Sequence, residues 1–325
     1  MNILTRLKPS TLALGVLLAI VQGVAHAQAY PTRPIKIVVP FPPGGGADVM
    51  ARLVGARLAQ RFGQPAIVEN MPGANTIIAA TNVAKSAPDG HTLLLAIDTT
   101  LAINPHMYRR LPYNPEKDLT PVTMLSTVPL VLVANKSVPG NLKDFIAYAN
   151  ANPGKVHFGA GVLTAQLTGE LFNKVAGTKL VYVPYKGGST SILAVLGGEI
   201  QVAVDGLSTT LPFWKAGKVS VLAVTTGKRT SLAPEMPTLA ELGLPGFNVS
   251  LWQSIVAPAG VPAAIIQRLN KELTEIMALD EVRKQIEPAG IEPLQGTTES
   301  FVRQIRAESE QWGKLIRELG LQPLD

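Results

Sequence analysis

The chain has 325 residues, of which 46% are hydrophobic, and a formal net charge of +6. This length is typical of two domains of about 150 residues each. The sequence contains no cysteine, which excludes disulfides, a cysteine nucleophile and the cysteine-linked lipid anchor of bacterial lipoproteins. Basic and acidic residues alternate along the chain, as in 303–318, instead of clustering with aromatic residues. We therefore expect no nucleic-acid partner.

The first residues have the pattern of an export signal. Two basic residues precede an apolar stretch at 12–24, and the sequence A-H-A follows and ends at Ala27. The stretch is shorter than the roughly 20 apolar residues of a membrane-spanning helix. We expect residues 1–27 to be a signal peptide, cleaved after Ala27, and the mature protein to lie in the periplasm without a lipid anchor.

An apolar strand at 35–40 leads into the sequence F-P-P-G-G-G-A-D, and a helix begins near Ala47. Successive glycines leave backbone N–H groups accessible, and the helix dipole adds positive potential at the same place. This arrangement predicts a site for an anion.

Extended and helical patterns alternate through the rest of the chain and predict an α/β fold with mostly parallel sheets. The connections between them are short and rich in turn residues. In chain order, the predicted elements after the first strand are a helix at 47–62, a strand at 66–69, a helix at 75–85, a strand at 91–97, a helix at 142–151, a strand at 155–159, a helix at 164–175, a strand at 180–184, a helix at 189–196, a strand at 201–204, a helix at 209–216, a strand at 219–225, and helices at 262–278 and 298–319.

Two long extended stretches, 122–134 and 249–257, are predicted to connect two domains. Two crossings imply a discontinuous first domain. On this interpretation residues 28–129 and 250–325 form domain 1, and residues 130–249 form domain 2. Two sequential domains divided near Val138 are the weaker alternative, because the C-terminal helices would then join a block that already has enough helices.

Six loops follow predicted strands, and in open α/β sheets ligands bind beyond the carboxyl ends of strands. Three loops belong to each predicted domain, which suggests an interdomain cleft that closes by a hinge motion. The loops are 41–48, 70–75, 98–100, 160–166, 185–189 and 205–208.

Several short motifs occur in an order and spacing that cover essentially the whole chain after the export signal. They are Y-P-T-R-P-I at 30–35, F-P-P-G-G-G-A-D at 41–48, V-E-N at 68–70, P-G-A at 72–74, A-P-D-G-H-T-L at 87–93, I-N-P at 103–105, L-P-Y at 111–113, V-P-Y-K-G at 183–187 and L-A-E-L-G at 239–243. Together they resemble the substrate-binding proteins of tripartite tricarboxylate transporters, the Bug or TctC family.

The resemblance implies a periplasmic receptor with a two-domain Venus-flytrap fold. Such a receptor encloses a small carboxylate and delivers it to a membrane transporter, as a monomer without cofactor or metal. It further implies that loops of domain 1 bind one carboxylate through backbone amides and that a helix N-terminus at 161–166 binds the other end, where Thr164 adds a hydroxyl. The expected ligand-binding residues are Phe41, Pro43, Gly44, Gly45, Asp48, Ala74, Asn75, Thr99, Thr100, Gly161, Thr164, Ala165, Gln166, Tyr185, Gly187 and Asp205.

Two of these residues are acids with alternative roles. Asp205 could bind an ammonium or hydroxyl group of the ligand, disfavour a second carboxylate, or cap the helix near Ser208. Asp48 could act on the dipole of its own helix. The sequence departs from the family pattern at Asn75-Thr76 and Val162-Leu163, so the ligand stays open among citrate-like, dicarboxylic, aromatic and amino acids.

No catalytic motif of a hydrolase or metalloenzyme is present. The chain lacks G-x-S-x-G, H-E-x-x-H and a P-loop, and the histidines after the export signal are isolated at 91, 106 and 157. The glycines at 159–161 do not complete a dinucleotide-binding motif. We therefore expect a receptor and no enzyme; a ligand sensor for a signalling partner is the alternative, and a periplasmic hydrolase or lyase is the less favoured one.

Overall fold

A computed structural model describes residues 30–325, so the predicted signal peptide lies outside the described residues. Residues 33–325 form one compact unit. Among residues 30–325, no helix combines the length and the apolar character required to cross a membrane.

A first group of parallel strands contains the predicted glycine turn. Its central strand β1 (Ile35–Val39) lies between β2 (Ala66–Asn70) and β3 (Thr92–Ile97). The turn leads into α2 (Gly46–Phe62), which ends where Gly63 adopts the left-handed conformation. The expected helix at 75–85 is shorter, because Ala74–Thr76 form a 3-10 turn with positive φ angles before α3 (Ile77–Ala84).

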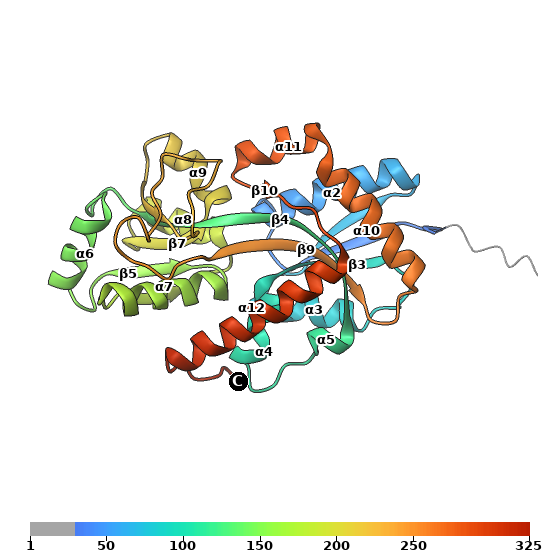
Figure 1. Cartoon of the computed structure of the whole chain (residues 1–325), viewed down its shortest axis with the longest axis horizontal. Coiled ribbons are helices and arrows are strands. Elements are labelled where there is room, and N and C mark those ends of the chain that lie inside the picture. The colour runs from blue at the N-terminus through green and yellow to red at the C-terminus, as the bar shows by residue number, and fades with distance from the viewer. Residues whose placement is uncertain (1–29) are drawn as a thin grey trace, which may run out of the picture. The chain divides into compact units, whose positions relative to one another are not determined.

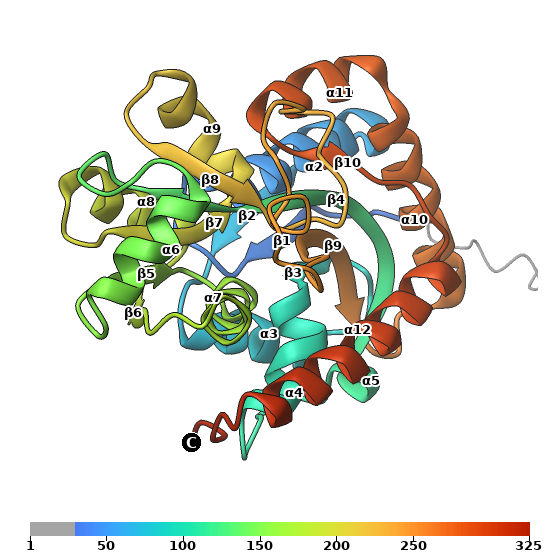
Figure 2. The same ribbon diagram turned by 60° about the vertical axis from the view of Figure 1, so that its left-hand side comes forward.

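A second group of parallel strands lies within residues 142–224. Strand β5 (His157–Ala160) pairs with β6 (Val181–Pro184) and with β7 (Val202–Gly206). Helices surround these strands, as Figure 2 shows. They are α6 (Leu142–Ala151), α7 (Leu163–Ala176), α8 (Gly188–Gly197) and α9 (Leu207–Lys215), and α9 is followed by β8 (Ser220–Val224).

Two long antiparallel strands connect the groups (Figure 1). Strand β4 (Leu119–Ala134) pairs with β9 (Ser250–Pro258) in its first part and with β7 and β8 in its last part. Strand β9 also pairs with β3, so the order is β2-β1-β3-β9-β4-β7-β5-β6. The α/β prediction is confirmed, and the sheet is mixed because both connecting strands run antiparallel to their neighbours.

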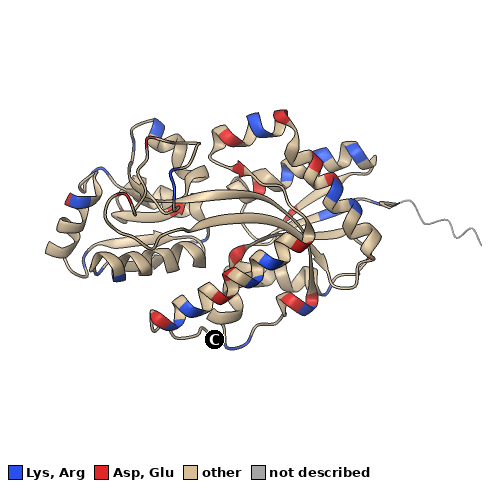
Figure 3. Cartoon of the chain, in the orientation of Figure 1, with Lys and Arg blue, Asp and Glu red and all other residues tan. Residues whose placement is uncertain are grey.

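The C-terminal helices cover the first group of strands (Figure 1). Figure 3 shows that basic and acidic residues alternate along α11 and α12, as expected for a solvated surface. The helices are α10 (Ala263–Ala278), α11 (Asp280–Ile286), which is followed by the 3-10 turn Glu287–Ala289 and by β10 (Glu292–Pro293), and α12 (Thr298–Glu318).

The sequence analysis missed three short elements after β3. A π-helical turn covers Thr99–Ile103, where a loop was predicted, and it continues into α4 (Asn104–Met107). Helix α5 (Pro115–Asp118) begins at Asn114, whose side chain accepts hydrogen bonds from two backbone N–H groups. Segments this short show too few residues for a helical period to be visible.

Candidate functional site

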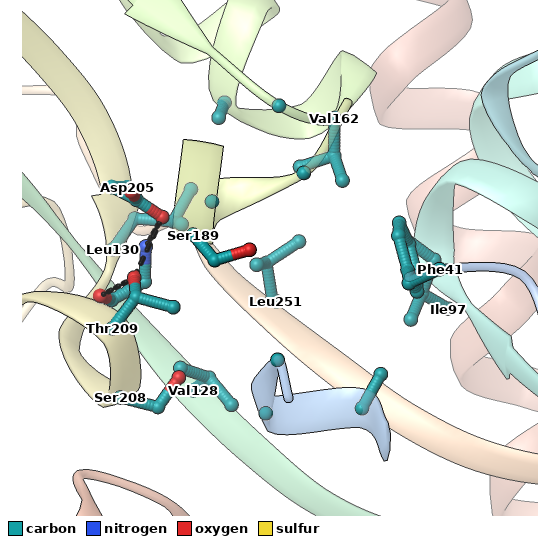
Figure 4. Close-up of a pocket in the computed structure, with 18 of the residues that line it drawn as sticks. Phe41, Ile97, Val128, Leu130, Val162, Ser189, Asp205, Ser208, Thr209 and Leu251 are labelled. Atoms are coloured by element: carbon teal, nitrogen blue, oxygen red, sulfur yellow. Dashed lines mark hydrogen bonds between the residues drawn. The ribbon is translucent and has the colours of Figure 1, made fainter. Parts of the chain in front are cut away.

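A cavity of about 80 Å³ lies between the two strand groups, where the loops after β1, β5, β6 and β7 meet β4 and β9 (Figure 4). This volume is well above the roughly 10–15 Å³ that a cavity needs to admit one water molecule. The lining residues are Phe41, Pro42, Gly45, Gly46, Ala47, Ile97, Val128, Leu130, Gly161, Val162, Ala165, Gly187, Gly188, Ser189, Val204, Asp205, Gly206, Ser208, Thr209, Leu251 and Gln253.

Four helices begin at this cavity. The residues that precede the first turns of α2, α7, α8 and α9 are Gly45, Val162, Gly187 and Gly206, and none of them caps its helix through a side chain. Three of the four are glycines, which have no side chain to offer. First-turn N–H groups have no partner inside their own helix, and together with the helix dipoles they attract an anion.

The lining is otherwise mostly apolar, and the part of the chain that the structure describes contributes no lysine, arginine or histidine to it. Figure 4 shows Phe41 and Ile97 on one side of the cavity and Asp205 and Thr209 on the other, with Leu251 between them. An anion held here therefore depends on backbone N–H groups and neutral side chains, while its body contacts hydrocarbon.

Asp205 is the ionisable residue of the lining, and it is already engaged. It is 5% exposed, and its carboxylate accepts hydrogen bonds from the Ser191 hydroxyl at 2.8 Å, the Gly206 N–H at 2.7 Å and the Thr209 hydroxyl at 2.9 Å. Burial raises the pKa of Asp205 to about 6, although these hydrogen bonds oppose the shift. Gly206, and not Asp205, is the N-cap residue of α9.

The structure brings six of the sixteen expected residues together around the cavity. They come from four of the six predicted loops and are Phe41, Gly45, Gly161, Ala165, Gly187 and Asp205. Loops 70–75 and 98–100 do not contribute to the lining.

Thr164 lies at the start of α7, but its hydroxyl points to the first strand group. It donates a hydrogen bond to Asp98 Oδ2 at 2.7 Å and lies 3.2 Å from the Thr99 hydroxyl. All three side chains are fully buried. Thr164 and Thr99 thus join residues of the two predicted domains, and neither lines the cavity.

The other expected residues also lie outside the cavity lining. Asn75 donates to the Tyr108 hydroxyl at 2.7 Å, and the Thr100 hydroxyl donates to Thr76 at 2.9 Å, so both hold the turn that begins at Ala74. Tyr185 is partly buried and packs against the core of the second strand group. Pro43, Gly44 and Gln166 also lie outside the lining; the Gln166 backbone N–H donates to Val162 inside α7.

Asp48 lies outside the cavity lining and stabilises the glycine turn through hydrogen bonds. Its carboxylate, 4% exposed, accepts hydrogen bonds from the Gly44 N–H at 3.0 Å, from Asn70 at 2.9 Å and from the Arg52 guanidinium at 2.9 and 3.0 Å. Although burial acts in the opposite direction, these partners hold the pKa of Asp48 below its ordinary value.

We expect Asp48→Ala to weaken ligand binding by about tenfold and to lower stability by about 2 kcal/mol, because it leaves the Gly44 N–H and the Asn70 amide without their acceptor. Arg52→Ala is the matched control, since it removes one exposed partner and keeps the Gly44 contact. Titration calorimetry and thermal unfolding of both variants check this. Equal losses in the two variants would contradict it.

The sequence analysis did not select several lining residues. Gly188, Ser189 and Ser208 lie inside or next to the predicted loops, where the strand-end rule already pointed. Gln253 and Leu251 lie within β9, a strand predicted only as a connection. A lining position in the middle of a strand leaves no turn signal in the sequence.

Residues 50–321 match the family model described as tripartite tricarboxylate transporter family receptor. The chain belongs to this family. BugT of Bordetella pertussis is 35% identical, with coverage of 90% of this chain and 91% of that protein. The solved structure of Rpa4515 from R. palustris with adipate is 35% identical to this chain, with a TM-score of 0.88. The match covers 91% of this chain and 100% of that one.

MatC from Rhodopseudomonas palustris, solved with bound malate, has a TM-score of 0.83 and 30% identity and covers 88% of this chain and 100% of its own. The tripartite tricarboxylate transporter receptors are periplasmic binding proteins, and their fold is the α/β fold seen here. The resemblance noted in the sequence is confirmed. The chain is a solute receptor of this family and not an enzyme.

Proposed function

We propose that this receptor captures a small aliphatic dicarboxylate in the cavity between the strand groups and delivers it to a tripartite tricarboxylate-type membrane transporter. The observation that carries the proposal is the convergence of four helix N-termini without side-chain caps on a cavity without a basic side chain. The relatives whose structures were solved with adipate and with malate support the class of ligand.

The distribution of these termini favours two anionic groups. Helix α2 follows a strand of the first group, whereas α7, α8 and α9 follow strands of the second group. One carboxylate would bind at each side, and the ligand body would lie between them. Apolar residues such as Ile97, Val162 and Leu251 surround that body, and they would leave a ligand hydroxyl without a partner. We therefore place adipate ahead of malate as a ligand.

We further propose that residues 28–129 and 250–325 act as one domain and residues 130–249 as the other. Strands β4 and β9 connect them and would provide the hinge. The Thr164 contacts with Asp98 and Thr99 join the two domains in the conformation described here. Separation of the domains would break them and open the cavity. Cleavage after Ala27 and release into the periplasm complete the proposal.

Thermal unfolding of the protein without its signal peptide tests this function. At a concentration one hundred times Kd, a ligand adds about 2.7 kcal/mol, which raises Tm by roughly 4 °C for a protein of this size. We expect this shift with adipate, a smaller one with malate, and little with hexanoate, which lacks the second carboxylate. The proposal fails if no small carboxylate raises Tm, or if incubation with the protein converts adipate to a product.

A further inference from the structure

Among residues 30–325, Gln253 is the one cavity-lining residue with a side-chain nitrogen. It lies on β9, where its backbone pairs with Ile97 on β3 and with Ser126 on β4, so it occupies the middle of the sheet. The residue is only 5% exposed. Its backbone is therefore fixed, and its side chain reaches the cavity from one of the two connecting strands.

Ser126 determines which end of the Gln253 amide faces the cavity. The fully buried Ser126 hydroxyl donates a hydrogen bond to Gln253 Oε1 at 3.1 Å. With the oxygen engaged, the NH2 group turns toward the first turn of α2. A Cβ atom built on Gly46 would lie 3.8 Å from Gln253 Nε2 and 3.0 Å from the Ser208 hydroxyl.

Gln253 Nε2 donates to no protein acceptor within residues 30–325, and it is not one of the fully buried atoms, so it is accessible from the cavity that Gln253 lines. An amide donor that faces a cavity and has no protein acceptor is left to bond with water or with a ligand. The backbone N–H groups at the start of α2 are donors as well, so they cannot accept a hydrogen bond from Gln253 Nε2. The donors of the amide, of α2 and of the Ser208 hydroxyl thus surround one corner of the cavity.

We infer that Gln253 is a specificity-determining residue, whose Nε2 donates a hydrogen bond to the ligand carboxylate at the α2 end of the cavity. This inference rests on the proposed function. Ser126 is a positioning residue, since it acts only through the Gln253 oxygen. A corner built from donors selects an acceptor such as a carboxylate, and it rejects a ligand whose end is an ammonium group.

The decisive variant is Gln253→Glu, which keeps the size of the side chain and replaces the donor with an acceptor. We would measure Kd by calorimetry for adipate and for 6-aminohexanoate, which carries an ammonium group in place of one carboxylate. The wild type should prefer adipate. Gln253→Glu should weaken adipate binding by about a hundredfold and reduce or reverse the preference, because like charges repel in a buried site.

Further variants distinguish the loss of the donor from a general structural effect. Gln253→Met keeps the volume without the donor, and we expect a loss of about tenfold for adipate. Ser126→Ala should have a smaller effect, and no additional effect in the double variant with Gln253→Met, because both act on one hydrogen bond. Gln201→Glu adds the same charge outside the cavity lining and should bind adipate like the wild type.

A measurement on the wild type covers the case in which a variant fails to fold. In a titration of 15N-labelled protein with adipate, the side-chain NH2 resonances of Gln253 should shift on binding. If the wild type binds adipate but these resonances do not move, or if both Gln253 variants bind adipate as the wild type does, the inference is wrong. If the wild type binds no carboxylate, the proposed function itself fails.

Discussion

Gly188→Ala is expected to weaken binding of the carboxylate ligand by about a hundredfold, or 2.7 kcal/mol. A Cβ atom on Gly188 would clash with Asp205 Oδ1 and lie only 3.0 Å from its Cγ. The Asp205 carboxylate cannot retreat, because Ser191, Gly206 and Thr209 all bind it. The start of α8 must move instead, and its N–H groups then leave the cavity.

Gly197→Ala is the matched control on the same helix. Its Cβ atom would lie 3.9 Å from the nearest atom, in Glu199, which is an ordinary contact. Alanine is favoured over glycine inside a helix by up to about 1 kcal/mol, so this variant should be as stable as the wild type and bind as well. Calorimetry measures binding, and circular dichroism verifies that both variants are folded. Wild-type affinity in folded Gly188→Ala would contradict the role of the α8 terminus.

The second large effect concerns Asp98, a fully buried acid without a cationic partner among residues 30–325. Burial, reinforced by the nearby Glu308 carboxylate, raises the pKa of Asp98 to about 8, against the hydrogen bonds from Thr164 and the Thr99 N–H. The neutral form is therefore favoured in the folded protein. The contribution of Asp98 to the free energy of unfolding is complete below about pH 4, its pKa in the unfolded chain. This contribution is lost progressively as the pH rises to about 8, its pKa in the folded protein.

Asp98→Asn removes this pH dependence, since an amide does not ionise. We expect the stability of the wild type to fall relative to that of Asp98→Asn between about pH 5 and about pH 9, by more than about 1 kcal/mol, because each pKa unit corresponds to 1.36 kcal/mol. Chemical unfolding across this pH range measures the difference. Parallel curves for the two proteins would show that Asp98 is not a neutral acid in the fold. Glu308→Gln, which removes the neighbouring charge, should reduce the difference in part.

The sequence predicted the features that repeat and missed those that depend on three-dimensional contact. Strands β4 and β9 were visible as long extended stretches, and the glycine turn before α2 predicted an anion site by its composition alone. Helix α4 and the π-helical turn before it were missed, since Asp98 and Thr99 look like an ordinary loop after a strand. Their burial comes from contacts with α7 and α12, which no local pattern reveals.

The candidate site divides in the same way. Positions such as Gly45, Gly161 and Gly187 lie in loops that follow strands, and the strand-end rule selected them. Thr164 was selected for its place at a helix N-terminus, but a partner more than sixty residues away in the sequence, Asp98, determines where its hydroxyl points. Gln253 was not selected, because its significance depends on the Ser126 contact across two strands.

The central claim is that helix N-termini, and not basic side chains, hold the ligand. A crystal structure of the protein with adipate tests it most directly. We predict one adipate carboxylate within hydrogen-bond distance of the first-turn N–H groups of α2, and the other within the same distance of those of α7, α8 or α9. An adipate bound outside this cavity, or held by lysine or arginine side chains, would contradict the claim.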